Sequence, residues 1–218
     1  VKKIAYVEVF ILFDGGLQDV YGTTTGSEIT RAEQRVYSGA TVTSTVLSDN
    51  AIQTVNNGAL VTETRNRHSI QNLLSGGRAE NTTLDDFAIQ NIAAGATAVN
   101  TSMLNSGQQN VRGTATNTDL SSYAVQNVYR GGTANQTGVY ERGVQNIFNG
   151  GSSVQATIYD GGIQNVLTGG TANSTTINGG GFFFFYRGWT VSDTSSKEGG
   201  SQNGNDGARG SDNTRGGE

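Results

Sequence analysis

The chain has 218 residues, of which 34% are hydrophobic and only 15% charged, and its net charge is -4. This charge argues against a nucleic-acid-binding surface, which concentrates Lys and Arg on one face, and the absence of cysteine excludes disulfides and thiol chemistry. Thirty-two glycines without a single proline, together with regularly placed Val and Ile, predict many short strands joined by tight turns.

The N-terminal stretch VKKIAYVEVFILF has two lysines followed by an apolar run, an arrangement that signal peptides also have. Glu8 interrupts the run, and no small-residue cleavage site follows it. Residues 1–11 are therefore predicted to form an opening strand or cap of the fold, with a signal remnant as the alternative.

A short box, in its fullest form x-Gln-Asn-aliphatic, recurs from residue 18 onward. The intervals between successive glutamines are 16, 19, 18, 19, 19, 17, 19 and 19 residues, and an aliphatic residue stands two places after every one of them. A repeat of fixed period decides the fold before any other signal does. The anchor glutamines are Gln18, Gln34, Gln53, Gln71, Gln90, Gln109, Gln126, Gln145 and Gln164.

A glycine turn and a second apolar position keep step with these anchors. Most units carry Gly-Gly or Gly-Ala five and six residues after the anchor. The second apolar position falls about six residues before the next anchor and usually follows Thr, and Arg65 is read as a break in this series. Its apolar members are Leu12, Leu47, Leu84, Leu120, Val139, Ile158 and Ile177.

The stretch GFFFFYRGWTV near the C-terminus is in register with the repeat. Phe183 lies nineteen residues after Gln164, and Phe185 takes the aliphatic position. Beyond Ser195 the frame persists without apolar residues, since Ser196 and Gly204 stand where Val or Ile is expected. We predict a repeat domain over residues 1–195 and a degenerate Gly/Ser/Asn-rich tail over 196–218 that frays because it buries nothing.

Each unit reads as strand, glycine turn, strand and turn, with too few apolar residues for a core of its own. Neighbouring units must therefore stack, which places each residue above its equivalent nineteen positions later in parallel strands about 4.8 Å apart. The units are too short for two helices and too rich in Gly, Asn and Thr. The prediction is an all-β, right-handed parallel β-helix of about eleven coils of ~19 residues.

Stacking also explains the glutamines, because amides of one type lie in a file and each can donate and accept. Ile163 and Val166 are three residues apart, so both face inward only if the strand bends at Gln164-Asn165. The Gln-Asn box is therefore predicted at a corner of the coil. The predicted structural ladder contains Gln71, Gln90, Gln126, Gln145 and Gln164.

The residue after each inward aliphatic position faces outward by strand alternation. Two outward aromatic files follow, which either stabilise the exposed sheet or contact another rod or a glycan. The candidate binding residues are Tyr21, Tyr37, Tyr129, Phe148 and Tyr186 in the first file, and Tyr140 and Tyr159 in the second.

The sequence offers little for catalysis. Enzymes built on β-helices act mainly on acidic polysaccharides with clustered carboxylates, whereas Asp85, Asp86 and Asp160 read as turn residues. His68 lies in a polar turn, and the segment NGNDG at 203–207 lacks the flanking pattern of calcium-binding repeats. We predict no enzymatic activity, no catalytic residue, no cofactor and no metal.

The segment GGIQNVLTGGTANSTTI at 161–177 resembles the passenger repeats of self-associating autotransporter adhesins of the AIDA-I, TibA and antigen 43 type. The resemblance covers roughly residues 12–195. It implies a β-helix exported through an outer-membrane barrel to the bacterial surface, where it promotes autoaggregation, biofilm formation or host attachment. This chain shows no translocator barrel, so export is implied by the resemblance alone.

The same resemblance implies partners and modifications. They are a second copy of the rod, a host surface or its glycans, and a glycosyltransferase that modifies hydroxyls of the repeats. A nucleic-acid partner is not expected, because of the net charge of -4. A glycan-binding or polysaccharide-degrading β-helix is the alternative function. The candidate O-glycosylation sites are Thr83, Thr137, Thr157, Ser174 and Thr176.

Overall fold

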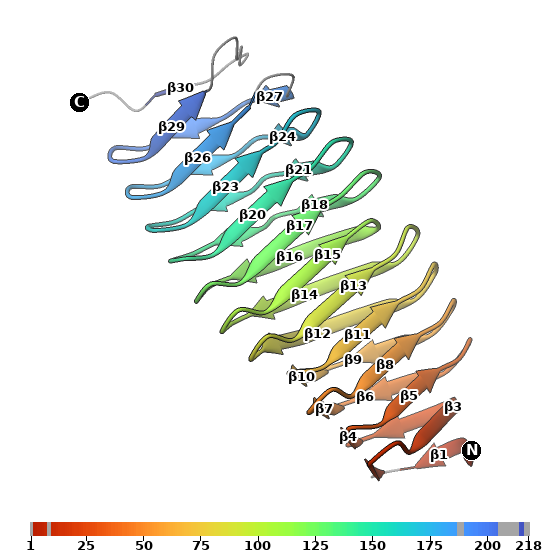
Figure 1. Cartoon of the computed structure of the whole chain (residues 1–218). Helices are drawn as coiled ribbons and strands as arrows, with labels where there is room; N and C mark the ends of the chain where they lie inside the picture. The colour runs from red at the N-terminus through yellow and green to blue at the C-terminus, as the bar shows by residue number, and fades with distance from the viewer. Residues whose placement is uncertain (1, 8–9, 187–189, 205–213, 216–218) are drawn as a thin grey trace.

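The computed structural model describes residues 2–7, 10–186, 190–204 and 214–215. Figure 1 shows a rod of stacked coils, with the first strand, β1, at one end of the rod and β29 near the other. All elements of the described residues are strands, and every pairing between them is parallel. The predicted all-β solenoid of stacked coils of ~19 residues is confirmed.

Each coil contributes strands to three faces of the rod. The first, here called the anchor face, carries the Gln box, and β1 (Lys2–Val7) pairs with its first strand. Its strands are β3 (Leu17–Thr25), β5 (Glu33–Val36), β8 (Ile52–Val55), β11 (Ile70–Leu73), β13 (Ile89–Ile92), β15 (Gln108–Val111), β17 (Val125–Val128), β20 (Val144–Ile147), β23 (Ile163–Val166), β26 (Phe182–Phe185) and β29 (Ser201–Gly204).

The second face follows the glycine turn, and the second half of β3 also belongs to it. Three long strands continue from the second face onto the third. The second face contains β6 (Thr41–Thr43), β9 (Leu60–Thr62), β12 (Arg78–Asp85), β14 (Thr97–Met103), β16 (Thr114–Leu120), β18 (Thr133–Asn135), β21 (Ser152–Val154), β24 (Thr171–Asn173) and β27 (Thr190–Ser192).

The third face closes each coil and leads back to the anchor face. Besides the ends of the three long strands it contains β2 (Ile11–Phe13), β4 (Glu28–Thr30), β7 (Val46–Ser48), β10 (Arg65–Arg67), β19 (Gly138–Val139), β22 (Thr157–Ile158), β25 (Thr176–Ile177), β28 (Ser195–Ser196) and β30 (Thr214–Arg215).

The glycine pair between the anchor face and the second face has a steric cause. Gly131 has φ +80°, a left-handed conformation that glycine adopts at no steric cost. A Cβ on Gly132 would collide with the carbonyl oxygen of Val111 in the preceding coil. In the coils with Gly-Ala, the alanine is buried instead, as Ala40 and Ala59 are.

The Gln-Asn box does not lie at a corner, so that prediction is wrong. In β23, Gln164 and Val166 are buried while Ile163 and Asn165 are partly exposed. This is the plain alternation of a straight strand. The prediction failed because it assigned Ile163 to the core, whereas the buried partner of Val166 is the glutamine.

The break in the second apolar series does not lie at Arg65, where the sequence predicts it. The register pairs Asn66, not Arg65, with Leu47 on one side and Leu84 on the other. Asn66 is fully buried, and Arg65 points outward into solvent. The polar substitution in the core is therefore an asparagine.

The ladder extends past the predicted end of the repeat domain. Ser195 and Ser196 pair with Thr176 and Ile177, and β29 pairs with β26. At the N-terminus, β1 gives the opening segment the predicted strand conformation. The domain boundary at residue 195 and the fraying of the tail stay predictions, since most of residues 205–218 lie outside the described residues.

Candidate functional site

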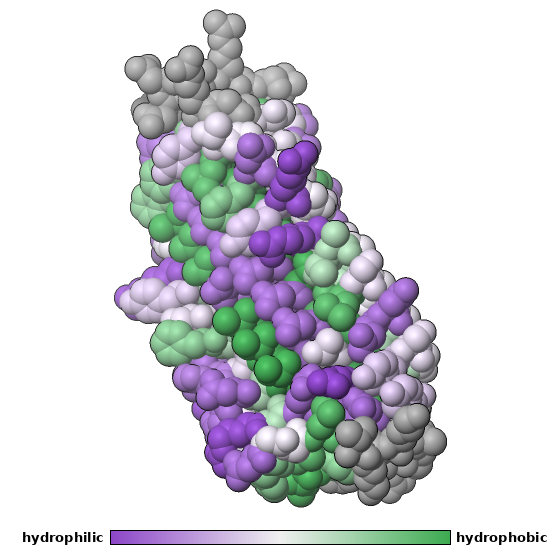
Figure 2. Space-filling view, turned by 45° about the vertical axis from the view of Figure 1, so that its right-hand side comes forward, coloured by the Kyte–Doolittle hydropathy of each residue, from purple (hydrophilic) through white to green (hydrophobic). Residues whose placement is uncertain are grey.

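The outward file of the anchor face carries aromatic rings in stacked register. Tyr129 and Phe148 lie in successive coils with ring centroids 5.0 Å apart, and the Arg112 guanidinium lies 4.5 Å from the centroid of Tyr129. Near the other end of the rod, Tyr21 and Tyr37 stack at 4.5 Å. Figure 2 shows that apolar patches on the surface alternate with polar side chains and form no continuous stripe.

Tyr186 is the last member of this file and is exposed. It lies two coils beyond Phe148, with Leu167 between them. The file is thus a series of short aromatic stacks along one face, with each side chain repeated at the spacing of the coils.

The second file is a single stacked pair on the third face. Tyr140 and Tyr159 have centroids 4.4 Å apart and nearly parallel rings, and both are exposed. Partial burial raises the pKa of Tyr140 to about 12, and the nearby Asp119 carboxylate adds to the shift. Burial also raises the pKa of Asp119, while the hydrogen bond that Tyr140 donates to it opposes that shift.

Four of the five candidate glycosylation hydroxyls are accessible. Thr157, Ser174 and Thr176 line one open hollow of about 490 Å³ beside Tyr140 and Tyr159. Thr83 lines another of about 420 Å³. Each of the four is partly exposed.

Thr137 is the exception, because its side chain is buried in the structure. Its residue is 1% exposed, and its hydroxyl donates a hydrogen bond of 3.2 Å to Oε1 of Gln126. The sequence places Thr137 among the outward threonines of the repeat, but it occupies the inward position after the left-handed residue Gln136. A glycosyltransferase cannot reach this hydroxyl in the folded rod.

The anchor glutamines form a continuous file of amides inside the rod. Each Nε2 donates to Oε1 of the glutamine in the preceding coil, from Gln34 to Gln164, at 2.5 to 2.7 Å. All nine side chains are fully buried. On the outward side of the same strands, the asparagines from Asn72 to Asn165 form a second amide file, with Nδ2–Oδ1 distances of 2.9 to 3.3 Å.

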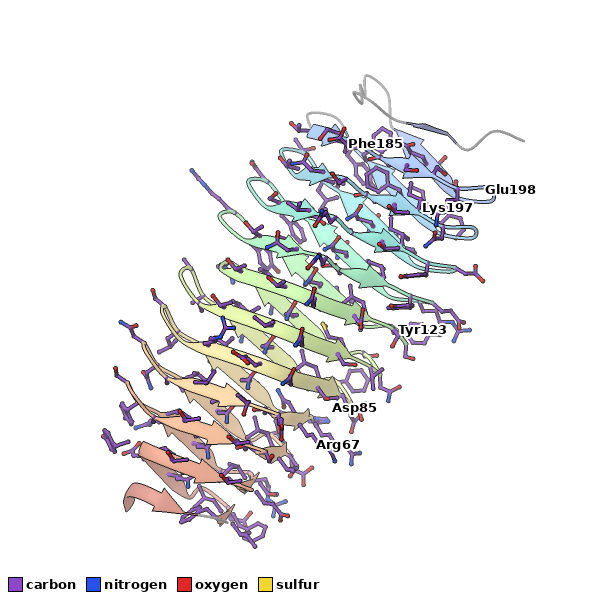
Figure 3. All side chains as sticks on the ribbon, turned by 180° about the vertical axis from the view of Figure 1, so that it is seen from behind. Arg67, Asp85, Tyr123, Phe185, Lys197 and Glu198 are labelled. Carbon is purple, nitrogen blue, oxygen red and sulfur yellow. The ribbon has the colours of Figure 1, made fainter. Side chains whose placement is uncertain are left out.

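Sequence reasoning missed the aromatic residues in the turn between the third face and the anchor face. Phe87 and Tyr123 are the most exposed of the large apolar side chains in the described part of the chain, at 64% and 58%. The signal that identifies them is their position in the repeat, three residues before the anchor. Glycine occupies the same turn position at Gly161 and Gly180. In Figure 3, Tyr123 lies on the same edge of the rod as Asp85 and Arg67.

Two further findings concern metal sites and membrane-spanning helices. Across the described ranges, no three His, Asp or Glu side chains gather in a group able to hold a metal ion. A search of the same ranges finds no helix with the length and apolar character needed to cross a membrane.

The comparisons with known proteins bear on the fold. No protein-family model and no curated protein sequence matches the chain. Among solved structures it is similar to the crystal structure of the TibA55-350 fragment hyper-glycosylated by TibC, with a TM-score of 0.71 at 24% sequence identity. The match covers 96% of this chain and 100% of that fragment. The two chains share a solenoid fold over nearly their whole length.

Proposed function

We propose that this chain is the passenger segment of a non-enzymatic bacterial surface adhesin that self-associates through the faces of its rod. The observation that carries the proposal is the outward aromatic file of the anchor face, where Arg112, Tyr129 and Phe148 stack in successive coils. A contact that is weak in one coil gains avidity when the same contact recurs along the rod. Autoaggregation, biofilm formation and host attachment are the activities that such a surface serves.

Export to the bacterial surface and glycosylation belong to the same proposal. The TibA fragment with the similar fold was glycosylated by TibC. In this chain, Thr157, Ser174 and Thr176 present hydroxyls in one open hollow of the third face. We propose these residues and Thr83 as acceptors for a glycosyltransferase.

Self-association is tested with beads coated with the purified chain, whose clumping is followed by light scattering. Replacing Tyr129 and Phe148 by Ser removes one aromatic stack, which contributes about 1 kcal/mol to the fold. We expect the β-rich far-UV spectrum to be unchanged and bead clumping to fall at least several-fold, because repeated contacts multiply.

The matched control replaces Tyr140 and Tyr159 by Ser, which removes a stacked pair of equal size from the third face. We expect this variant to clump like the unmodified chain. Clumping lost only in the control would place the contact on the third face, and clumping kept in both variants would contradict association through either file. Hydrolysis of an acidic polysaccharide by the purified chain would contradict the adhesin proposal itself.

A further inference from the structure

The turn that leads from the third face to the anchor face, here called the edge turn, has a residue with positive φ in every coil, also at Arg31, Asn50 and His68 nearer the N-terminus, and in two coils this residue is Phe or Tyr. The strand register makes Phe87, Ser106, Tyr123, Arg142 and Gly161 equivalent in successive coils. All five have positive φ, with +61° at Phe87 and +68° at Tyr123. The coils beyond carry glycine at this position, at Gly180 and Gly199.

Positive φ suits glycine and strains other residues, bulky ones above all. Phe87 and Tyr123 adopt it although their rings lie mostly in solvent and fill no core position. Strained residues persist only where the surrounding structure imposes them, and they concentrate at functional sites. Since the other coils share this conformation, the exposure of two large rings is what sets these coils apart, and it indicates a contact outside the fold.

The two rings flank a hollow of about 490 Å³ on the edge of the rod. They lie two coils apart, about 10 Å along the rod, since one coil separates stacked strands by 4.8 Å. The coil between them contributes the small polar residues Asn105 and Ser106 to the lining. The lining consists of Asp86, Phe87, Asn105, Ser106, Ser121, Ser122, Tyr123, Tyr140, Glu141 and Arg142.

Several contacts fix the geometry of this hollow. The Arg142 guanidinium lies 5.1 Å from the centroid of the Tyr123 ring, and His68 meets the Phe87 ring edge-on at 6.5 Å. Tyr140 is held by its stack on Tyr159. A site whose walls are already ordered loses little side-chain entropy when a ligand binds.

We propose that this edge hollow binds a neutral oligosaccharide. A sugar ring has an apolar C–H face, which packs on an aromatic ring, and a rim of hydroxyls, which both donate and accept hydrogen bonds. Phe87 and Tyr123 supply two such rings within reach of one extended chain. Ser and Asn side chains between them supply hydroxyl and amide partners.

The lining also discriminates between ligand classes. Asp86 and Glu141 are paired with Arg67 and Arg142, at 4.0 and 3.4 Å, so the hollow has no unpaired positive charge to attract an acidic polysaccharide. Its apolar members are all aromatic, without the aliphatic side chains that line the groove for an apolar peptide. This binding goes beyond self-association, which is proposed for the anchor face.

The test measures binding of cellohexaose, maltohexaose and hexa-N-acetylchitohexaose to the full chain by saturation-transfer NMR and calorimetry, with polygalacturonate as the acidic comparator. Phe87→Gly combined with Tyr123→Gly removes both rings and installs the residue that the turn conformation favours. We expect at least one neutral hexasaccharide to bind the unmodified chain and to lose at least tenfold in affinity in this variant, while the melting temperature stays equal or rises.

Asn50→Gly is the matched control, because Asn50 has φ +66° at the same turn position but lies outside the hollow. We expect its sugar binding to equal that of the unmodified chain. The proposal is overturned if no neutral hexasaccharide binds, if the double variant binds equally well, or if its melting temperature falls, which would make the rings structural. It is also overturned if the double variant loses bead clumping with sugar binding intact. The sugar-binding test is independent of the clumping assay, so an unchanged clumping of the Tyr129 and Phe148 variant would contradict the proposed self-association but not the sugar site.

Discussion

At the scale of single residues, the inner amide file links each coil to the next. Gln126 donates to Gln109, and its Oε1 accepts from both Gln145 and Thr137. Gln126→Met keeps the volume but leaves Nε2 of Gln145 and the hydroxyl of Thr137 without a partner, each at about 1–3 kcal/mol, while Oε1 of Gln109 keeps its bond from Thr118. We expect a loss of about 3 kcal/mol or more, measured as a fall in the melting temperature followed by far-UV circular dichroism.

Gln164→Met is the comparison, because Gln164 ends the file and Phe183 follows it in the next coil. After this change Oε1 of Gln145 keeps its bond from Ser153, so chiefly the hydroxyl of Thr175 loses a partner. We expect a smaller fall in the melting temperature than for Gln126→Met. Equal falls would show that continuity of the file contributes nothing beyond local packing.

At the scale of the element, β10 carries the polar break in the apolar file of the third face. Asn66 lies between Leu47 and Leu84, and within the described part of the chain its buried Oδ1 accepts no hydrogen bond. Asn66→Leu continues the leucine file and removes this unpaired carbonyl, which costs about 1–3 kcal/mol when buried. We expect the variant to melt at a higher temperature, and Arg65→Leu, on the outward side of the same strand, to leave it nearly unchanged. A lower melting temperature for Asn66→Leu would show that its bond to the carbonyl of Ile89 is essential.

The element scale also shows how far the sequence predicts the structure. The period alone placed Gln164 beside Gln145 and Phe183 beside Gln164, and both pairings are confirmed. The period does not reveal which way a side chain points, so Ile163 is predicted inward and Gln164 at a corner, whereas Ile163 is partly exposed and Gln164 is buried in a straight strand. Hydropathy fails here because an amide file satisfies its own hydrogen bonds and is then as easily buried as an aliphatic side chain.

The edge turn was missed for a related reason. A turn with positive φ is predicted from glycine or asparagine, and Phe87 and Tyr123 are neither. Only their position in the repeat, three residues before an anchor glutamine as for Gly161, indicates this turn. Residues that break a local rule of this kind are expected at functional sites.

At the scale of the whole molecule, the rod is a linear array in which each coil contacts its neighbours. β20 pairs with β17 on one side and β23 on the other. The stability of such an array is a sum of coil terms and nearest-neighbour interface terms, so damage to one coil acts first on the two coils that share an interface with it. A globular domain of the same length, by contrast, loses its whole core together.

Ile147→Asp tests this linear arrangement. Ile147 is fully buried and lies between Val128 and Val166, so an aspartate there places an unpaired carboxylate in the core, at a cost of several kcal/mol. We expect hydrogen exchange followed by mass spectrometry to show lost protection in β17, β20 and β23 and retained protection in β5 and β8, more than four coils away. Asn149→Asp, which adds the same charge in an exposed turn two residues on, is the control and is expected to exchange like the unmodified chain. Uniform loss of protection along the rod would contradict the nearest-neighbour description, and unchanged protection around β20 would contradict the burial of Ile147.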